Sequence, residues 1–137
     1  ILSNFESKAR KIQVTLHTDV KLPEELDAND TELCSLLSNA LENAITAASL
    51  VEDKKLRKVY IQTVINDNRL VISTENAYRG KIDMEGDLPK ASKKDDGHGF
   101  GIKSMVDIVE RHGGLYSFEA EGGICIMRLL LPLGENK

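Results

Sequence analysis

The sequence lacks two features that would place it on a membrane or on nucleic acid. No apolar run approaches the roughly 20 residues that a membrane-spanning helix needs, and the N-terminus has no apolar segment of the signal-peptide kind. Basic residues are not in excess, since 18 Lys and Arg face 22 Asp and Glu and the net charge is −4. Because nucleic acid and acidic membrane surfaces attract surplus positive charge, we expect this chain to contact neither.

Cysteine is also scarce. Cys34 and Cys125 both lie in apolar runs, where we expect them to be reduced and buried, as in a cytoplasmic protein. The three histidines, His17, His98 and His112, have neither the spacing nor the neighbours of a metal cluster. A zinc site of His and Cys is therefore not expected.

What the chain does have is enough apolar sequence for one core. With 137 residues, 41% hydrophobic, it is long enough for one domain and too short for two. In residues 1–10, Leu2, Phe5 and Ala9 are spaced as on a helix, so we expect this segment to be the end of a longer helix of a preceding domain. Residues 11–137 are then the domain itself.

Alternation of apolar and polar residues predicts five strands. Ile12, Val14 and Leu16 indicate the first, which should end between residues 19 and 23. Residues 59–65 and 70–74 flank a turn-forming stretch, 66–69, and predict an antiparallel hairpin. Residues 115–121 and 124–131, on either side of Gly122 and Gly123, predict a second hairpin.

Two segments have the periodicity of amphipathic helices. The first should begin near Asn29, with Glu32 as its capping partner, and run to about Leu50. Its apolar positions are Leu33, Leu36, Leu37, Ala40, Leu41, Ala44, Ile45 and Ala48. The second helix is marked by Ile102, Met105, Val106 and Val109 and should end at Gly113 and Gly114.

The segment from residue 77 to about residue 97 has no periodicity. Irregular segments of this length in a compact domain are often functional lids. The expected order is thus strand, helix, two strands, long loop, helix, two strands. Helices interleaved with hairpins predict an α+β two-layer sandwich, in which helices cover one face of a mixed, mainly antiparallel sheet.

Two asparagines on the first helix are candidates for a binding site. Asn39 and Asn43 lie one turn apart at the border of the apolar stripe. Asn is unfavourable inside a helix because its side chain competes for backbone hydrogen bonds. Neutral carboxamide oxygens suit a Mg²⁺ ion that already carries phosphate and water ligands. The alternative is a pair of solvated polar residues.

The second helix opens with a glycine-rich segment. Gly97, Gly99 and Gly101 allow close approach of the backbone, and the free N–H groups of a helix start attract anions. Lys103 either adds a positive charge or is solvated, and a flexible hinge is the alternative for the whole segment. The segment does not resemble a P-loop, since no Gly-Lys-Ser/Thr follows. It does not resemble a Rossmann fingerprint either, since a long loop rather than a strand precedes it.

With these motifs the sequence resembles the catalytic ATP-binding domains of sensor histidine kinases, which are members of the GHKL superfamily. Residues 39–44 match the N box of these kinases, which implies Asn39 and Asn43 as catalytic residues, with Asn43 as the Mg²⁺ ligand and Asn39 near the phosphates. Residues 97–102 match the second glycine box. The implied contacts of the ATP triphosphate are Gly97, His98, Gly99, Phe100, Gly101, Ile102 and Lys103. Residues 77–97 would form the ATP lid.

The first glycine box departs from the usual Asp-x-Gly-x-Gly. Here Asn76 stands in place of the Asp that binds the adenine amino group, and Tyr78 replaces a glycine, while Gly80 is kept. The carbonyl oxygen of Asn76 can still accept that hydrogen bond, without the charge. An Asn at this position resembles the subfamily that includes peptide quorum-sensing kinases.

Asn39 bears on the reaction. In the ATP-hydrolysing branch of the superfamily, a Glu four residues before the metal-binding Asn activates water. Asn39 cannot take up a proton at neutral pH, which favours transfer of the γ-phosphoryl group to an external acceptor.

The resemblance therefore implies a two-component sensor histidine kinase that uses ATP and Mg²⁺. Its acceptor histidine would lie in an adjacent dimerisation and phosphoacceptor domain, because none of the three histidines of this chain is suitably placed. That domain and a response regulator are the implied partners. The parent would be a homodimer whose kinase domain lies in the cytoplasm, whether or not the parent is anchored in a membrane.

Two alternative functions stay open. One is a serine kinase of the anti-sigma-factor type, which the helix at residues 1–10 disfavours. The other is a degenerate domain that acts as a scaffold or nucleotide sensor, which Asn76 and Tyr78 motivate.

Overall fold

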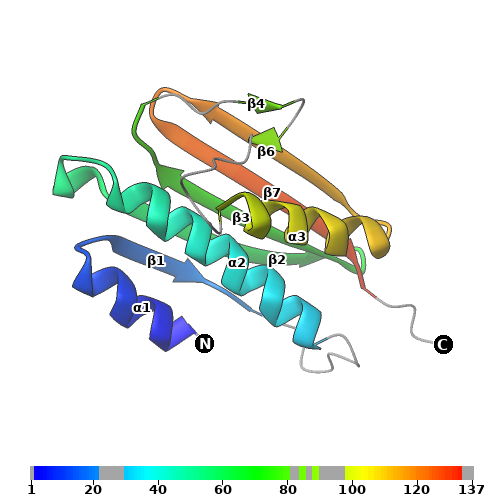
Figure 1. Ribbon diagram of the computed structural model, residues 1–137. Coiled ribbons are helices and arrows are strands. Elements are labelled where there is room, and N and C mark those ends of the chain that lie inside the picture. Colours follow the sequence, from blue (N-terminus) through cyan, green and yellow to red (C-terminus); the bar gives the residue numbers. More distant parts are fainter. Residues whose placement is uncertain (1, 22–29, 81–83, 86–87, 90–97, 134–137) are drawn as a thin grey trace.

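The computed structural model describes residues 2–21, 30–80, 84–85, 88–89 and 98–133. Three α-helices pack on one face of a five-stranded sheet (Figure 1). The elements are α1 (Leu2–Lys11), β1 (Thr15–Asp19), α2 (Asp30–Ser49), η1 (Lys54–Leu56), β2 (Lys58–Asn66), β3 (Arg69–Ala77), β4 (Met84–Glu85), β5 (Leu88–Pro89), α3 (His98–Arg111), β6 (Leu115–Glu121) and β7 (Ile124–Pro132). The predicted α+β two-layer architecture is confirmed.

The sheet is mixed, as predicted. Its strand order is β1-β2-β3-β7-β6, in which β1 runs parallel to β2 and every other neighbouring pair is antiparallel. The β2–β3 turn places Asp67 and Asn68 at φ of 51° and 59°, the two positive values of a type I′ hairpin. Both predicted hairpins are therefore present, and the last strand, β7, lies inside the sheet rather than at its edge.

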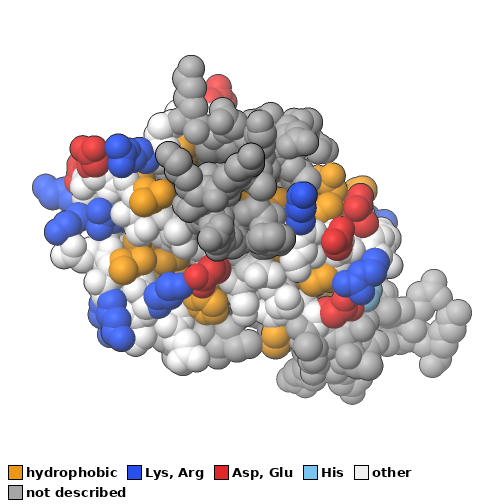
Figure 2. All heavy atoms as spheres, in the orientation of Figure 1, with side chains coloured by type: hydrophobic (Ala, Val, Ile, Leu, Met, Phe, Trp, Pro, Cys, Tyr) orange, Lys and Arg blue, Asp and Glu red, His pale blue; other side chains and the backbone are white. Residues whose placement is uncertain are grey.

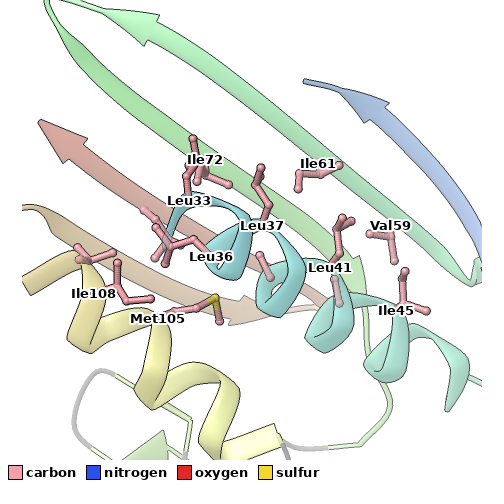
Figure 3. Close-up of a cluster of buried hydrophobic side chains, with 14 of the residues drawn as sticks. Leu33, Leu36, Leu37, Leu41, Ile45, Val59, Ile61, Ile72, Met105 and Ile108 are labelled. Atoms are coloured by element: carbon pink, nitrogen blue, oxygen red, sulfur yellow. The ribbon is translucent and has the colours of Figure 1, made fainter. Parts of the chain in front are cut away.

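Helix α2 lies over the middle of the sheet and supplies more of the core than any other element of the described residues. All eight of its predicted apolar positions are buried. Figure 3 shows Leu33 beside Ile72 on the sheet, with Leu36 nearer to Met105 and Ile108 of α3. Burial of a Leu or Ile side chain of this size stabilises a fold by roughly 1.5–3 kcal/mol. The core thus fixes where α2 and α3 sit relative to the sheet.

The first strand was predicted to start too early. Helix α1 ends in a Schellman motif, in which the N–H of Val14 donates to the carbonyl oxygen of Ala9 at 2.9 Å and Gln13 takes a left-handed φ of 60°. The turn occupies residues that alternate like a strand, so β1 begins only at Thr15. Ile12 and Val14 still pack against the core, which explains their apolar character.

Part of the predicted irregular segment is regular. The short strands β4 and β5 pair antiparallel, Met84 with Pro89 and Glu85 with Leu88, so the expectation of no strand between residues 77 and 97 was wrong for these four residues. Pairs of two-residue strands leave no periodicity to detect. The predicted helix start at Asn29 lies outside the described residues. None of the helices in the described ranges is long and apolar enough to span a membrane.

Candidate functional site

Asn39 and Asn43 lie on one side of α2, at the margin of the buried stripe. Both are half-buried, their neighbours Ala40 and Ala44 are buried, and Glu42 is exposed, as the helical periodicity predicts. The Nδ2 group of Asn39 lies 3.4 Å from Ser35 Oγ, one turn earlier. Glu42 instead pairs with Lys8 of α1, so its carboxylate is directed toward solvent and not toward the two amides.

Asn43 has a polar atom without a partner. Its Nδ2 is buried and makes no hydrogen bond, the one such side-chain atom among the described residues. Buried polar groups in native folds nearly always have a partner, so an exception indicates a missing ligand, ion or water. Rotation of the carboxamide by half a turn would place Oδ1 at the same point, so this position can offer either a donor or an acceptor.

Helices α2 and α3 run antiparallel, which brings the two predicted motifs together. Glu32 near the start of α2 contacts His112 just past the end of α3, and the two helices lie side by side in Figure 1. Asn43 is eleven residues beyond Glu32, and Gly101 is eleven residues before His112. At 1.5 Å per residue, both backbones lie about 16 Å from that contact. The N-terminal turn of α3 is therefore level with Asn43.

The glycine segment is more helical than predicted. Helix α3 begins at His98, so Gly99, Phe100 and Gly101 belong to its first turn. Ile102 is half-buried and packs against the core, whereas Lys103 is exposed. Gly97 and the side chains of residues 98–101 lie outside the described part of the structure.

Asn76 occupies a buried position on β3, on the face covered by the helices. It is 6% exposed, and its Nδ2 donates to the backbone carbonyl oxygen of Ala77 at 2.9 Å. The side-chain oxygen Oδ1 of Asn76 is therefore the atom that can accept a hydrogen bond. In the sheet it pairs with Val59, which lies beneath α2 beside Leu41 and Ile45 (Figure 3). The same stretch of α2 that carries Asn43 thus lies over the strand pair that carries Asn76.

The other neighbour of Asn76 in the sheet is Cys125 on β7. Burial raises the pKa of this thiol to about 12, so it is a neutral, unreactive group at physiological pH. Both cysteines are free, as expected, but Cys34 is half-buried rather than buried.

The chain leaves the sheet one residue after Asn76. The pairing of β3 with β7 ends at Ala77, and the N–H of Tyr78 then donates to the carbonyl oxygen of Gly123 at 3.0 Å. Gly80 has a φ of +74°, a left-handed conformation that favours glycine. Gly80, which the resemblance assigns to the first glycine box, is thus at a position whose backbone geometry favours glycine.

A charged cluster at the far end of the two helices was not predicted. Glu32 Oε1 lies 2.8 Å from His112 Nε2, and Glu32 Oε2 lies 2.9 Å from an Arg111 guanidinium nitrogen. The hydrogen bond with His112, aided by the charge of Arg111, holds the pKa of Glu32 below its usual value of 4.5. On the right of Figure 2, over the end of α3, acidic, basic and histidine side chains lie together. No local pattern links residues 80 positions apart, so the sequence could not reveal this contact.

The family model for the GHKL domain matches residues 29–132, from the start of the α2 segment to the end of β7. The chain belongs to the GHKL domain family. The GHKL match leaves α1 and β1 outside its bounds, so the assignment of residues 1–10 to a preceding domain stays a prediction. Among curated proteins, none matches the sequence significantly.

Solved structures of histidine kinases share this GHKL fold. The nucleotide-free catalytic domain of histidine kinase ThkA superimposes with a TM-score of 0.71 at 22% identity, over 95% of this chain and 86% of that one. The histidine kinase domain of blue-light-activated EL346 from Erythrobacter litoralis gives 0.70 at 16% identity, over 96% and 57%. Full-length ShkA in complex with AMPPNP gives 0.67 at 16% identity, over 95% and 28%. At these identities the likeness concerns the fold.

Proposed function

We propose that this GHKL domain is the ATP-binding catalytic domain of a two-component sensor histidine kinase. It would transfer the γ-phosphoryl group of ATP to a histidine on an adjacent dimerisation and phosphoacceptor domain. The family, the fold shared with histidine kinase domains and the Asn43 amide support this assignment. A response regulator would then receive the phosphoryl group, and the parent would be a homodimer with this domain in the cytoplasm.

The observation that carries the proposal is the unpartnered amide of Asn43. A buried amide N–H group without a hydrogen bond costs roughly 1–3 kcal/mol, which a protein tolerates when a ligand supplies the partner. Asn43 is level with the start of α3, where free backbone N–H groups and the helix dipole attract phosphate. An amide that would bind the metal, level with a helix start that would bind phosphate, suits a magnesium nucleotide.

Each residue then has a role that its position permits. Asn43 would hold Mg²⁺, Asn39 would lie near the phosphates, and Asn76 would accept the adenine amino group through Oδ1. The first turn of α3 and Lys103 would contact the triphosphate. Mg²⁺, when bound, supplies charge neutralisation for the transferred phosphoryl group. The protein's own contribution is to hold the nucleotide in place.

Within the part of α2 that the structure describes, no free carboxylate lies next to Asn43 in the sequence. The carboxylate nearest to Asn43 along the chain is that of Glu42, which is exposed and paired with Lys8. Asn39, one turn before Asn43, is an amide that bonds to Ser35. This arrangement supports phosphoryl transfer to an external acceptor over hydrolysis.

Calorimetric titration with a non-hydrolysable ATP analogue, with and without Mg²⁺, tests the proposal. The wild type should bind with Mg²⁺-dependent affinity, and Asn43→Ala should bind about tenfold more weakly, which corresponds to about 1.4 kcal/mol. Asn66→Ala, at an exposed strand end, is the matched control and should bind like the wild type. No detectable binding by the wild type would contradict the proposal and favour the degenerate scaffold.

A further inference from the structure

Glu32 joins the N-terminal end of α2 to the C-terminal end of α3. One oxygen of its carboxylate meets His112 and the other meets Arg111, so each oxygen has its own partner at 2.8–2.9 Å. The side chains of Glu32 and His112 are only 28% and 27% exposed, and Arg111 is 63% exposed. Charge signs also agree with the helix dipoles, since the Glu32 carboxylate lies at a helix start and the Arg111 guanidinium lies at a helix end.

The C-terminal end of α3 is fixed in a second way. A Schellman motif closes the helix, with N–H groups of Gly113 and Gly114 donating to the carbonyl oxygens of Glu110 and Val109 at 3.0 and 2.8 Å. This motif fixes how the helix leads into β6. The Glu32 contact ties the same end of α3 to α2.

Apolar packing and the charged contact restrain different motions. Met105, Ile108 and Val109 hold α3 close to α2 and the sheet, but contacts between apolar side chains are non-directional. Hydrogen bonds to both carboxylate oxygens are directional, so they resist sliding of α3 along its axis. Because a helix of fourteen residues is stiff, a displacement of Arg111 along the helix axis moves His98 by the same distance.

We propose that Glu32 is a positioning residue of the nucleotide site, which sets the distance between the first turn of α3 and Asn43 by holding Arg111 and His112. This inference rests on the proposed function, because the distance between α3 and Asn43 matters for binding only if a nucleotide lies between them. Misplacement of a binding group by 1 Å can cost about 100-fold in reaction rate, so a contact about 16 Å away along stiff helices matters for the site.

The test compares Glu32→Ala with Glu119→Ala, a carboxylate that pairs with Arg128 on β6 and β7, away from α2 and α3. Each variant is titrated with the Mg²⁺ complex of a non-hydrolysable ATP analogue and, separately, with adenosine. Glu32→Ala should bind the triphosphate about threefold to tenfold more weakly than the wild type. Adenosine affinity should stay within about twofold, because Asn76 lies on β3 and not on α3. Glu119→Ala should match the wild type for both ligands.

A second pair of variants approaches the contact from α3. His112→Gln keeps a donor within reach of Glu32 and should bind the triphosphate like the wild type, whereas His112→Ala should behave like Glu32→Ala. Hydrogen exchange without nucleotide provides a readout that does not depend on binding: the amides of α3 should exchange faster in Glu32→Ala than in Glu119→Ala.

The outcomes separate the two proposals. Unchanged triphosphate binding in Glu32→Ala, or equal weakening for triphosphate and adenosine, would show that Glu32 is merely structural and would overturn the inference. If the wild type binds neither ligand, the proposed function fails, and the role of Glu32 as a site-positioning residue fails with it. Exchange in α3 that is equal in both alanine variants would overturn the contact's restraining role even if binding is observed.

Discussion

Gly114 lies so close to Leu130 that the chain has no room for a side chain at this position. A Cβ at residue 114 would lie 2.0 Å from the carbonyl oxygen of Leu130, and 3.0 Å from Val109 Cγ1. The preceding Gly113 has open space around it but a left-handed φ of 71°. The two glycines that end α3 are therefore required for different reasons.

Substitution of each glycine by alanine distinguishes these reasons. Gly114→Ala should lower the free energy of unfolding by at least about 2 kcal/mol, because backbone must move to remove the overlap. Gly113→Ala should cost about 1 kcal/mol, the cost of a left-handed conformation for a residue with a Cβ. Urea unfolding followed by circular dichroism measures both. Equal losses would contradict the close approach of Gly114 to β7.

Gln13 holds a left-handed conformation that glycine would adopt more easily. It follows α1 with a φ of 60°, in the position that glycine usually takes in a Schellman motif. Gln13→Gly should therefore raise the free energy of unfolding, by about 1 kcal/mol at most. Glu6→Gly, at an exposed position within α1, should lower it by about 1 kcal/mol. If both variants are destabilised in thermal unfolding, the turn geometry assigned to Gln13 is wrong.

Glu32 should make the stability of the domain depend on pH in the acidic range. Its pKa in the fold lies below the usual 4.5, because His112 and Arg111 stabilise the carboxylate. A lowered pKa means that the contribution is fully present above pH 4.5 and is lost as pH falls through the folded-state value. Melting temperatures of the wild type and Glu32→Gln should differ at pH 7 and converge as the pH is lowered. A constant difference would argue against the ionised contact.

Removal of Mg²⁺ should affect the wild type more than Asn43→Ala. If Asn43 is the metal ligand, chelation with EDTA should weaken binding of the ATP analogue by the wild type about tenfold, and by the variant much less. The double comparison isolates the contribution of the amide to metal binding. Equal losses of affinity in both proteins would show that groups other than Asn43 bind the metal.

The kinase proposal also makes a prediction about phosphate transfer. With radiolabelled ATP, this chain alone should acquire no stable label, because its histidines lie on β1, at the start of α3 and just past its end. The ring of His17, for example, stacks on the ring of Tyr60 on the sheet, with 4.6 Å between the ring centroids. Addition of a cognate phosphoacceptor domain should produce label on that domain. Stable label on the present chain would contradict the assignment.

The sequence predicted what local patterns determine. The stripe from Leu33 to Ala48 defines α2 because burial repeats with the helical period, and the pair Asp67 and Asn68 marks a hairpin because few residues accept two positive φ values. The positions of Asn39 and Asn43 followed from the same stripe. Their binding roles, like that of Asn76, remain predictions from resemblance.

What the sequence did not predict depends on contacts between distant segments. The pairing of Glu32 with His112 joins residues on two helices and has no local signature. The start of β1 was misplaced because Gln13 interrupts an alternating pattern with a left-handed turn. Strands as short as β4 and β5 carry too few residues for a period. In each case tertiary structure overrides the local pattern.

The strand order has a consequence for synthesis of the protein. Among the strands of this sheet, β7 is the last to be made, yet it lies between β3 and β6 and is paired with both. Until β7 has left the ribosome, β6 has no neighbour in the sheet and one edge of β3 is open. A nascent chain can therefore complete the hairpin of β2 and β3 early, but its sheet closes only when the final strand is released, and exposed strand edges in that interval are sites where chaperones would bind.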